Sequence, residues 1–228
     1  MTSTLETLRL RTRELHLALE ARLDLERLLG SRPEYTRLLL GYLAIYRPLE
    51  RALTAQASTL SQWGWVPLAR TPLIEQDLRM LGWNDEQLCS ARECQTLPAL
   101  ADCDALLGAL YVVEGSSLGG QLLYRQVAER LALDSASGAS FFYGAGPDTG
   151  AGWKRFAASL AAGVANPEQA AASACAMFRT FEQELVAATA CCTATAANPQ
   201  APDRAPQPAP RHSNAGSPAP VQIKLPLA

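Results

Sequence analysis

The chain has 228 residues, a mass of 24.5 kDa and a formal net charge of −2, from 20 Lys and Arg against 22 Asp and Glu. Hydrophobic residues make up 48% and charged residues 18%, which is enough for a sizeable core in one domain. The near-neutral balance argues against a nucleic-acid-binding protein, which needs a clear excess of cations. No apolar run approaches the roughly 18 to 20 residues of a membrane span, and the polar N-terminal sequence predicts no export signal, so we expect a cytoplasmic protein without a membrane partner.

The first 192 residues are predicted to form a helical domain, because Leu, Ala, Arg, Glu and Gln dominate and runs of β-branched residues are absent. Gly30 ends the first periodic stretch, Pro33 opens the second helix, and Pro48 is expected to bend it. The predicted helices cover residues 5–29, 33–60, 71–81, 84–91, 102–132, 151–164 and 167–191. We expect a loop over 134–150, and an all-α fold class, a single-domain multi-helix bundle.

The composition changes near residue 193. Residues 193–228 hold eight of the 15 prolines and show no apolar periodicity. Such a segment cannot bury enough apolar surface to offset its ordering entropy, so the sequence predicts a disordered Pro- and Ala-rich tail after a domain at 1–192. His212 lies in this tail, which makes it a poor candidate for an active site.

The first helix has two distinct faces when its residues are placed at about 100° per residue. The apolar face holds Leu8, Leu15, Leu19 and Leu23. The adjacent face holds Arg9, Arg13, His16 and Glu20. A histidine that binds a metal needs its second ring nitrogen oriented by a partner, which Glu20 supplies one turn on, and two arginines suit a carboxylate-bearing ligand. The alternative is a packed histidine beside a solvated arginine face.

Three glycines interrupt the helix predicted over 102–132. Gly115, Gly119 and Gly120 stand in a strong helical pattern, and each costs roughly 0.5 to 1 kcal/mol relative to alanine. One explanation is the close approach of a bulky planar ligand to the backbone, or a kink that opens and closes over it. The other is tight helix packing through Gly115 and Gly119, which are four residues apart.

Two segments, LRLRTRELHLALE at 8–20 and YVVEGSSLGGQ at 111–121, lie about 100 residues apart in this helical chain. Together they resemble the haem (heme) oxygenase family, and most of all its bacterial biliverdin-producing branch, which includes the haem oxygenases associated with bacterial phytochromes. The GW pair at 152–153 and the NP pair at 166–167 also fit. The resemblance covers about residues 5–190 and leaves the tail out.

The resemblance implies a bundle that holds haem between the first helix and a kinked, glycine-rich distal helix. His16 would be the ligand to the haem iron, with Glu20 as its oriented neighbour. The distal backbone would be formed by Gly115, Gly119 and Gly120. Arg9 and Arg13 would be the basic residues near the haem propionates. The family often carries a further cation on a later helix, where this chain has Ala157. Lys154 and Arg155 lie close to that position and are the further candidates.

Ser116 marks a departure from the family pattern. Many members carry an aspartate directly after the first distal glycine, where it organises water near bound dioxygen, and bacterial members show a similar replacement. We expect Ser116, or a water molecule held near it, to donate a hydrogen bond to dioxygen on the distal side.

The implied activity is the oxidative cleavage of haem by dioxygen and electrons to biliverdin, ferrous iron and carbon monoxide. Haem would be both substrate and cofactor, which requires firm binding and release of the product. The implied partners are an external electron donor, a ferredoxin or a flavin or NADPH reductase, and a bacterial phytochrome as one recipient of biliverdin.

Three other classes of protein stay open. The first is a haem-binding or storage protein of the same fold without turnover, in which Ser116 would reflect lost catalysis. The second is a helical di-iron oxidase, which needs several histidines and carboxylates, whereas the predicted domain has one histidine. The third is a structural bundle or thiol sensor. The chain has six cysteines that lack CxxC spacing and are predicted to be free thiols, namely Cys89, Cys94, Cys103, Cys175, Cys191 and Cys192.

Overall fold

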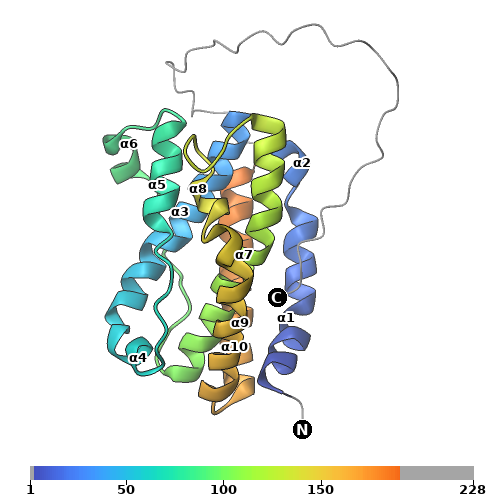
Figure 1. The fold of residues 1–228 in the computed structure, drawn as a ribbon, viewed down its shortest axis with the longest axis vertical. Helices are drawn as coiled ribbons and strands as arrows, with labels where there is room; N and C mark the ends of the chain where they lie inside the picture. Colours follow the sequence, from blue (N-terminus) through green and yellow to red (C-terminus); the bar gives the residue numbers. More distant parts are fainter. Residues whose placement is uncertain (1–2, 191–228) are drawn as a thin grey trace, which may run out of the picture.

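The computed structural model describes residues 3–190 (Figure 1). Within this range the chain forms ten α-helices and one short 3-10 helix, and no strand, so the all-α prediction is confirmed. The helices are α1 (Thr4–Arg22), α2 (Leu25–Leu28), α3 (Arg32–Ala55), α4 (Ala57–Gln62), α5 (Thr71–Met80), α6 (Asp85–Ser90), α7 (Cys103–Leu131), α8 (Ser140–Tyr143), η1 (Gly146–Asp148), α9 (Thr149–Gly163) and α10 (Pro167–Thr189). The tail predicted over 193–228, and with it Cys191, Cys192 and His212, lies outside the described residues and stays a prediction.

Two predicted boundaries are wrong for local reasons. The first helix does not run to residue 29, because the backbone is extended at Leu23 and the Asp24 side chain accepts the N–H of Arg27 to start α2. The second helix runs through Pro48 to Ala55, and the chain then restarts as α4.

The predicted loop over 134–150 contains two short helical elements, α8 and η1. The carboxylate of Asp77 on α5 accepts the backbone N–H groups of Ser140 at 2.7 Å and Phe141 at 2.8 Å, which are the first amides of α8. These amides have no partner inside so short a helix. A side chain 63 residues away in sequence satisfies them, so local sequence patterns could not predict α8.

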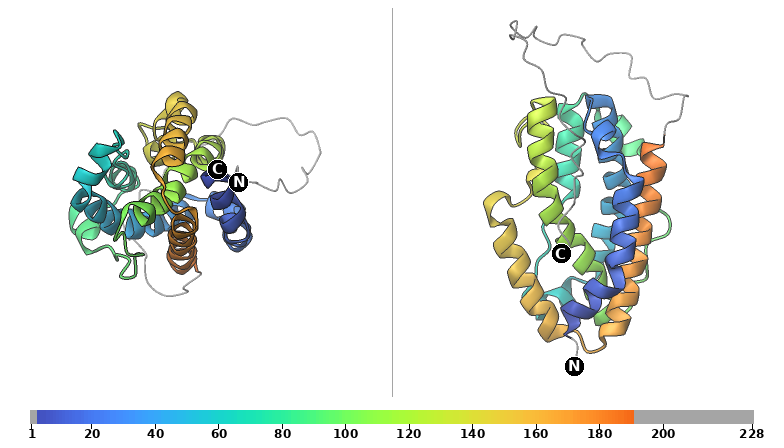
Figure 2. Two further views of the ribbon diagram at one scale, coloured as in Figure 1. Left: turned by 90° about the horizontal axis from the view of Figure 1, so that it is seen from below. Right: turned by 90° about the vertical axis from the view of Figure 1, so that its right-hand side faces the viewer.

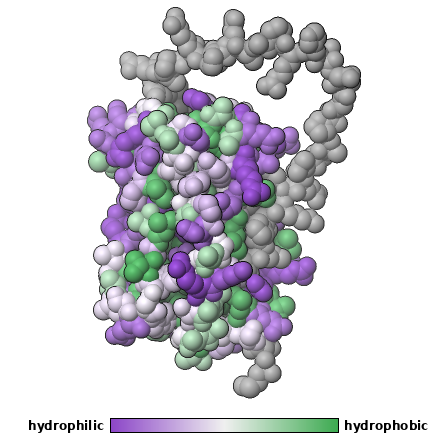
Figure 3. Space-filling model, in the orientation of Figure 1, coloured by the Kyte–Doolittle hydropathy of each residue, from purple (hydrophilic) through white to green (hydrophobic). Residues whose placement is uncertain are grey.

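The long helices run side by side along the long axis of the molecule (Figures 1 and 2). The C-terminal helix α10 is central, since it packs against α1, α3 and α7. The other side of α7 contacts α8 and α9. The core is built from leucines around large buried rings such as Tyr35, Tyr46 and Phe156. On the face seen in Figure 3, separate apolar patches lie between hydrophilic side chains.

Gly108 lets α7 approach α10 closely. A Cβ built at Gly108 would lie 2.0 Å from the carbonyl oxygen of Ala170, a backbone atom that cannot move without shifting the helix. We therefore expect Gly108→Ala to lower the free energy of unfolding by about 1 to 3 kcal/mol, the usual cost of overpacking, despite the better helix propensity of alanine. Urea unfolding tests this, with Gly150→Ala as control, because a Cβ at Gly150 meets no atom within 4 Å.

Among the described residues no helix is both long and apolar enough to cross a membrane. Cys89, Cys94, Cys103 and Cys175 are free thiols. Burial raises the pKa of Cys94, Cys103 and Cys175, so each is a poorer thiolate than an ordinary cysteine at neutral pH. This environment does not favour the thiol-sensor alternative for these three residues.

Candidate active site

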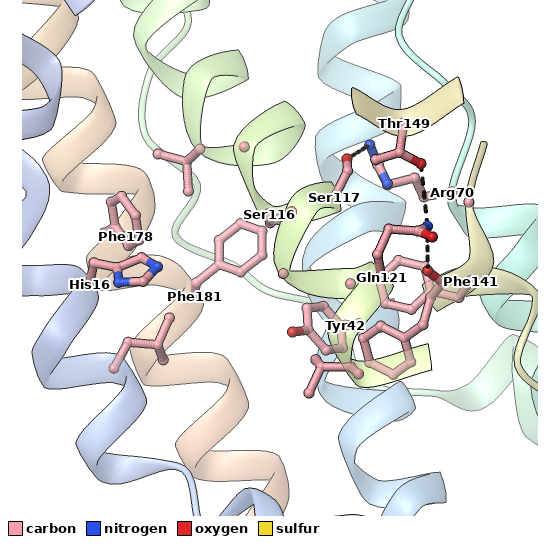
Figure 4. Close-up of a pocket in the computed structure, with 18 of the residues that line it drawn as sticks. His16, Tyr42, Arg70, Ser116, Ser117, Gln121, Phe141, Thr149, Phe178 and Phe181 are labelled. Carbon is pink, nitrogen blue, oxygen red and sulfur yellow. Dashed lines mark hydrogen bonds between the residues drawn. The ribbon is translucent and has the colours of Figure 1, made fainter. Parts of the chain in front are cut away.

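A mainly apolar cavity of about 940 Å³, including the open space at its mouth, lies between α1, α7 and α10 and extends to α3 and α8 (Figure 4). Five of the residues singled out from the sequence line it: His16, Gly115, Ser116, Gly119 and Gly120. In Figure 4 His16 on α1 and the Ser116 region of α7 lie on opposite sides of the space. The fold thus brings together two segments that are about 100 residues apart in sequence.

His16 is partly buried, and its ring extends from α1 toward the cavity (Figure 4). Its Nδ1 is 3.8 Å from Oε1 of Glu20, beyond hydrogen-bond distance, and has no hydrogen-bond partner among the described residues. Phe178 packs its ring edge-on at 5.8 Å between centroids. Burial lowers the pKa of His16, and Glu20 partly opposes this shift, so the imidazole is neutral at pH 7 and able to bind a metal.

The glycines of α7 divide into two kinds. Gly115, Gly119 and Gly120 line the cavity, whereas the close helix contact occurs at Gly108 against Ala170. A Cβ at Gly120 would lie 3.5 Å from the carbonyl oxygen of Phe142, an ordinary contact distance. The three cavity glycines present backbone without side chains to the cavity, which fits a ligand that approaches the backbone there.

Ser116 is exposed toward this space. Its hydroxyl donates to the carbonyl oxygen of Val113 at 2.7 Å and lies 3.4 Å from the hydroxyl of Tyr46. Because the Ser116 proton is engaged by the backbone, its lone pairs are the groups available to a bound water molecule. To donate a hydrogen bond directly to a ligand, the Ser116 hydroxyl has to break its hydrogen bond to the carbonyl oxygen of Val113.

The cations named from the sequence do not line the cavity. Arg9 and Arg13 are exposed on α1, and Lys154 and Arg155 are exposed on α9. Arg9 lies near enough to the cavity wall to act on Tyr111, whose pKa is raised by burial and lowered in part by Thr12 and Arg9. The propionate role of these cations stays a prediction.

Arg70 is a cavity residue that sequence reasoning missed. Glu50 of α3 accepts the N–H groups of Arg70 and Thr71, which starts α5 and places the Arg70 side chain against the cavity. Its guanidinium is 5.8 Å from the ring centroid of Tyr46 and donates to Ser117 at 2.7 Å. No local pattern marks Arg70, because its partners come from α3 and α7.

Gln121 and a set of aromatic residues were also missed. The Gln121 amide donates to the carbonyl oxygen of Tyr143 at 2.7 Å and lies 3.3 Å from the hydroxyl of Thr149, which ties α7 to the segment around α8. Beside Tyr111, the aromatic side chains that line the cavity are Tyr42, Phe141, Phe142, Phe178 and Phe181. The adjacent pair Phe141–Phe142 in a polar loop was a usable signal, since exposed phenylalanines are uncommon.

The chemistry of the residues that line the cavity fits a haem group. The cavity offers apolar and aromatic walls for a large planar ring, a glycine-rich segment of α7, and one neutral imidazole. The buried Nδ1 without a partner lies one turn from a carboxylate that can orient it. Within residues 3–190 no group of three or more His, Cys, Asp and Glu side chains could hold a metal ion, and a di-iron centre needs such a group.

Comparisons with known proteins agree with this geometry. A sequence model described as heme oxygenase matches residues 2–186. The heme oxygenase of Xanthomonas campestris pv. campestris (strain 8004) is 31% identical over 156 residues, which cover 64% of this chain and 89% of that protein.

Two solved structures share the fold. The heme oxygenase of Leptospira interrogans has a TM-score of 0.67 at 20% identity, covering 81% of this chain and 99% of its own. The NO- and CO-bound heme oxygenase of Neisseria meningitidis has a TM-score of 0.68 at 19% identity, covering 86% and 96%. With a family match over nearly all of the described residues and a curated bacterial relative matched over most of its length, the chain belongs to the haem oxygenase family and to its class of enzyme.

Proposed function

We propose that the chain binds haem in this cavity with His16 as the protein ligand to the iron, and cleaves it with dioxygen and electrons to biliverdin, ferrous iron and carbon monoxide. The observation that carries the proposal is the position of His16 across one cavity from the glycine-lined side of α7. Haem would supply both the redox-active iron and the carbon skeleton that is cleaved.

The residues of the chain bind, orient and shield the substrate. His16 would hold the haem iron as a neutral imidazole, and Glu20, whose Oε1 is 3.8 Å from Nδ1, would orient the ring. Gly115, Gly119 and Gly120 would present backbone without side chains to the bound substrate. Phe141 and Phe142 line the cavity, and their apolar rings would shield the bound substrate from water.

Ser116 holds water on the distal side in this proposal. We expect Ser116→Ala to slow turnover by about 10-fold or more, because an ordered proton donor near dioxygen is lost, while haemin affinity stays unchanged. Single-turnover kinetics with purified protein measure both quantities. Full turnover in Ser116→Ala, with an unchanged lifetime of the oxygenated complex, would exclude this role.

An external reductant is needed for the reaction, and we propose a ferredoxin or a flavin or NADPH reductase as the donor. Arg9 and Arg13 are exposed on α1, where Arg9 acts on the cavity residue Tyr111, and they would offer positive charge to an acidic donor or to the haem propionates. Lys154 and Arg155 on α9 are the second cationic candidates. A bacterial phytochrome is proposed as one recipient of the biliverdin.

The test begins with a titration of the purified protein with haemin, followed by a reductant in air. One-to-one binding, then loss of the Soret band and growth of a broad verdin band, is the expected result. A complex that keeps its spectrum under reductant would identify a haem carrier and overturn the enzymatic part of the proposal. Chromatography of the product then identifies the biliverdin isomer.

A further inference from the structure

A second cavity, of about 550 Å³ including the open space at its mouth, adjoins the haem cavity. Arg70, Ser117 and Thr149 line both cavities and are the partition between them. The remaining walls of the second cavity include Trp65, Glu114, Trp153 and Arg155. Ser117 therefore lies between the α7 segment of the haem site and the second cavity.

Glu114 and Arg70 place charge at this partition. The Glu114 side chain is 11% exposed and that of Arg70 is 5% exposed, and Oε2 of Glu114 is 3.4 Å from a terminal guanidinium nitrogen of Arg70. The same nitrogen donates to Ser117 at 2.7 Å. Oε1 of Glu114 and Nε of Arg70 are buried without a hydrogen-bond partner among the described residues. Buried polar atoms of this kind usually bind ordered water, so we expect water beside Glu114 and Arg70.

The haem cavity itself lacks an acid. Among the described residues that line it, none is Asp or Glu, and Ser116 engages its proton with the backbone. Oxygen chemistry that ends in water nevertheless consumes protons on the distal side. Glu114 is two residues from Ser116 on the same helix and faces the other cavity, so it is the carboxyl group nearest in sequence to the glycine segment.

Resting on the proposed function, we propose that Glu114 is the proton entry group of this enzyme, that Arg70 and Ser117 position it, and that protons pass from the second cavity through water at this partition to the distal side of the haem.

The proton balance is simple. The Glu114 carboxyl gives its proton to a water molecule at the partition, and hydrogen-bonded water beside Ser117 and Ser116 passes a proton to the distal side. The carboxylate then regains a proton from bulk water at the mouth of the second cavity. Arg70 exchanges no proton in this sequence and acts only as a positioning residue.

The surroundings of Glu114 suit this exchange. Arg70 and the indole of Trp65 face it directly, Tyr46 and Glu50 lie beyond Arg70, and Arg155 lines the outer wall. Burial raises the pKa of Glu114, with Arg70 opposing the shift. A carboxyl group that titrates closer to neutral pH releases and regains protons more readily at working pH.

The test compares Glu114→Gln and Ser117→Ala with Glu129→Gln, a control at an exposed position of α7. In both test variants we expect turnover to fall about tenfold or more while haemin affinity changes less than about twofold. The ionisation seen in the pH profile of wild-type turnover should disappear in Glu114→Gln and persist in Ser117→Ala and in the control. The Ser117 variant leaves both buried charges in place, so it keeps the test valid if Glu114→Gln folds poorly.

A readout without haem accompanies the kinetics. Trp65 lines the second cavity together with Glu114, so tryptophan emission of the haem-free protein should show a pH transition above the ordinary carboxyl range that Glu114→Gln abolishes and Ser117→Ala retains. Wild-type turnover with unchanged rates and pH profiles in both test variants would overturn this inference alone. A wild-type protein that leaves haem intact would overturn the proposed function and this inference with it.

Discussion

Replacing His16 by alanine is expected to remove the proposed iron ligand while leaving the fold intact. His16 is the single histidine within residues 3–190, and its ring lies at the edge of the cavity, not in the leucine core. We expect haemin affinity to fall by about 100-fold or more, since disturbing only the supporting partner of a metal ligand already costs about 10- to 100-fold. The Soret band of the histidine-bound complex and all turnover should be lost. Haemin titration and unfolding by urea measure the two effects separately.

Leu17→Ala is a matched control, because Leu17 is 42% exposed on the next position of α1. Added imidazole should restore part of the His16→Ala spectrum by entering the space left by the side chain. Haemin binding by His16→Ala with wild-type affinity and spectrum would show that another group holds the iron.

Asp77→Ala is expected to have the largest effect on stability. Asp77 is 0% exposed and is the acceptor for two backbone amides of α8, those of Ser140 and Phe141. Each amide left buried without a partner costs about 1 to 3 kcal/mol, so we expect the free energy of unfolding to fall by about 2 to 5 kcal/mol. Urea unfolding measures this, and the Tm should fall by about 5 °C or more in a domain of this size.

Haem binding should weaken in the same variant, because α8 carries Phe141 and Phe142 into the cavity wall. Asp77→Asn keeps one acceptor oxygen and should lie between Asp77→Ala and wild type. The control is Asp85→Ala, whose exposed ion pair with Arg79 is worth at most about 1 kcal/mol. An Asp77→Ala protein as stable as this control would contradict the capping role.

The helical fold and one half of the site followed from local patterns. The helical period of 3.6 residues predicted that His16 lies beside the buried face of α1. The glycines of α7 disfavour a helix, so their presence indicated a role other than helix formation. These are properties of single helices, so a single sequence carries them. The break at Leu23 was missed because Asp24 caps α2 without interrupting the apolar pattern.

The other half of the site depends on contacts between distant segments. Arg70 is placed by Glu50 and held by Ser117, and α8 is capped by Asp77 on α5. Asp77 stands in the apolar pattern of α5 between Ile74 and Leu78, a polar residue at a core position, which was a detectable signal. The partners of Asp77, however, are backbone amides, which every residue except proline carries. The sequence therefore does not predict which amides Asp77 binds.

The bare side of α7 has a consequence for the amount of enzyme in a cell. Three glycines in place of alanines leave the helix less stable by about 1.5 to 3 kcal/mol. A ligand present at about 100 times its Kd stabilises the folded state by about 2.7 kcal/mol, which is a similar amount. The chain would therefore survive proteolysis better when its substrate is abundant than when it is scarce. Under the proposed function, haem supply would set the lifetime of the protein that removes it, without any dedicated regulator.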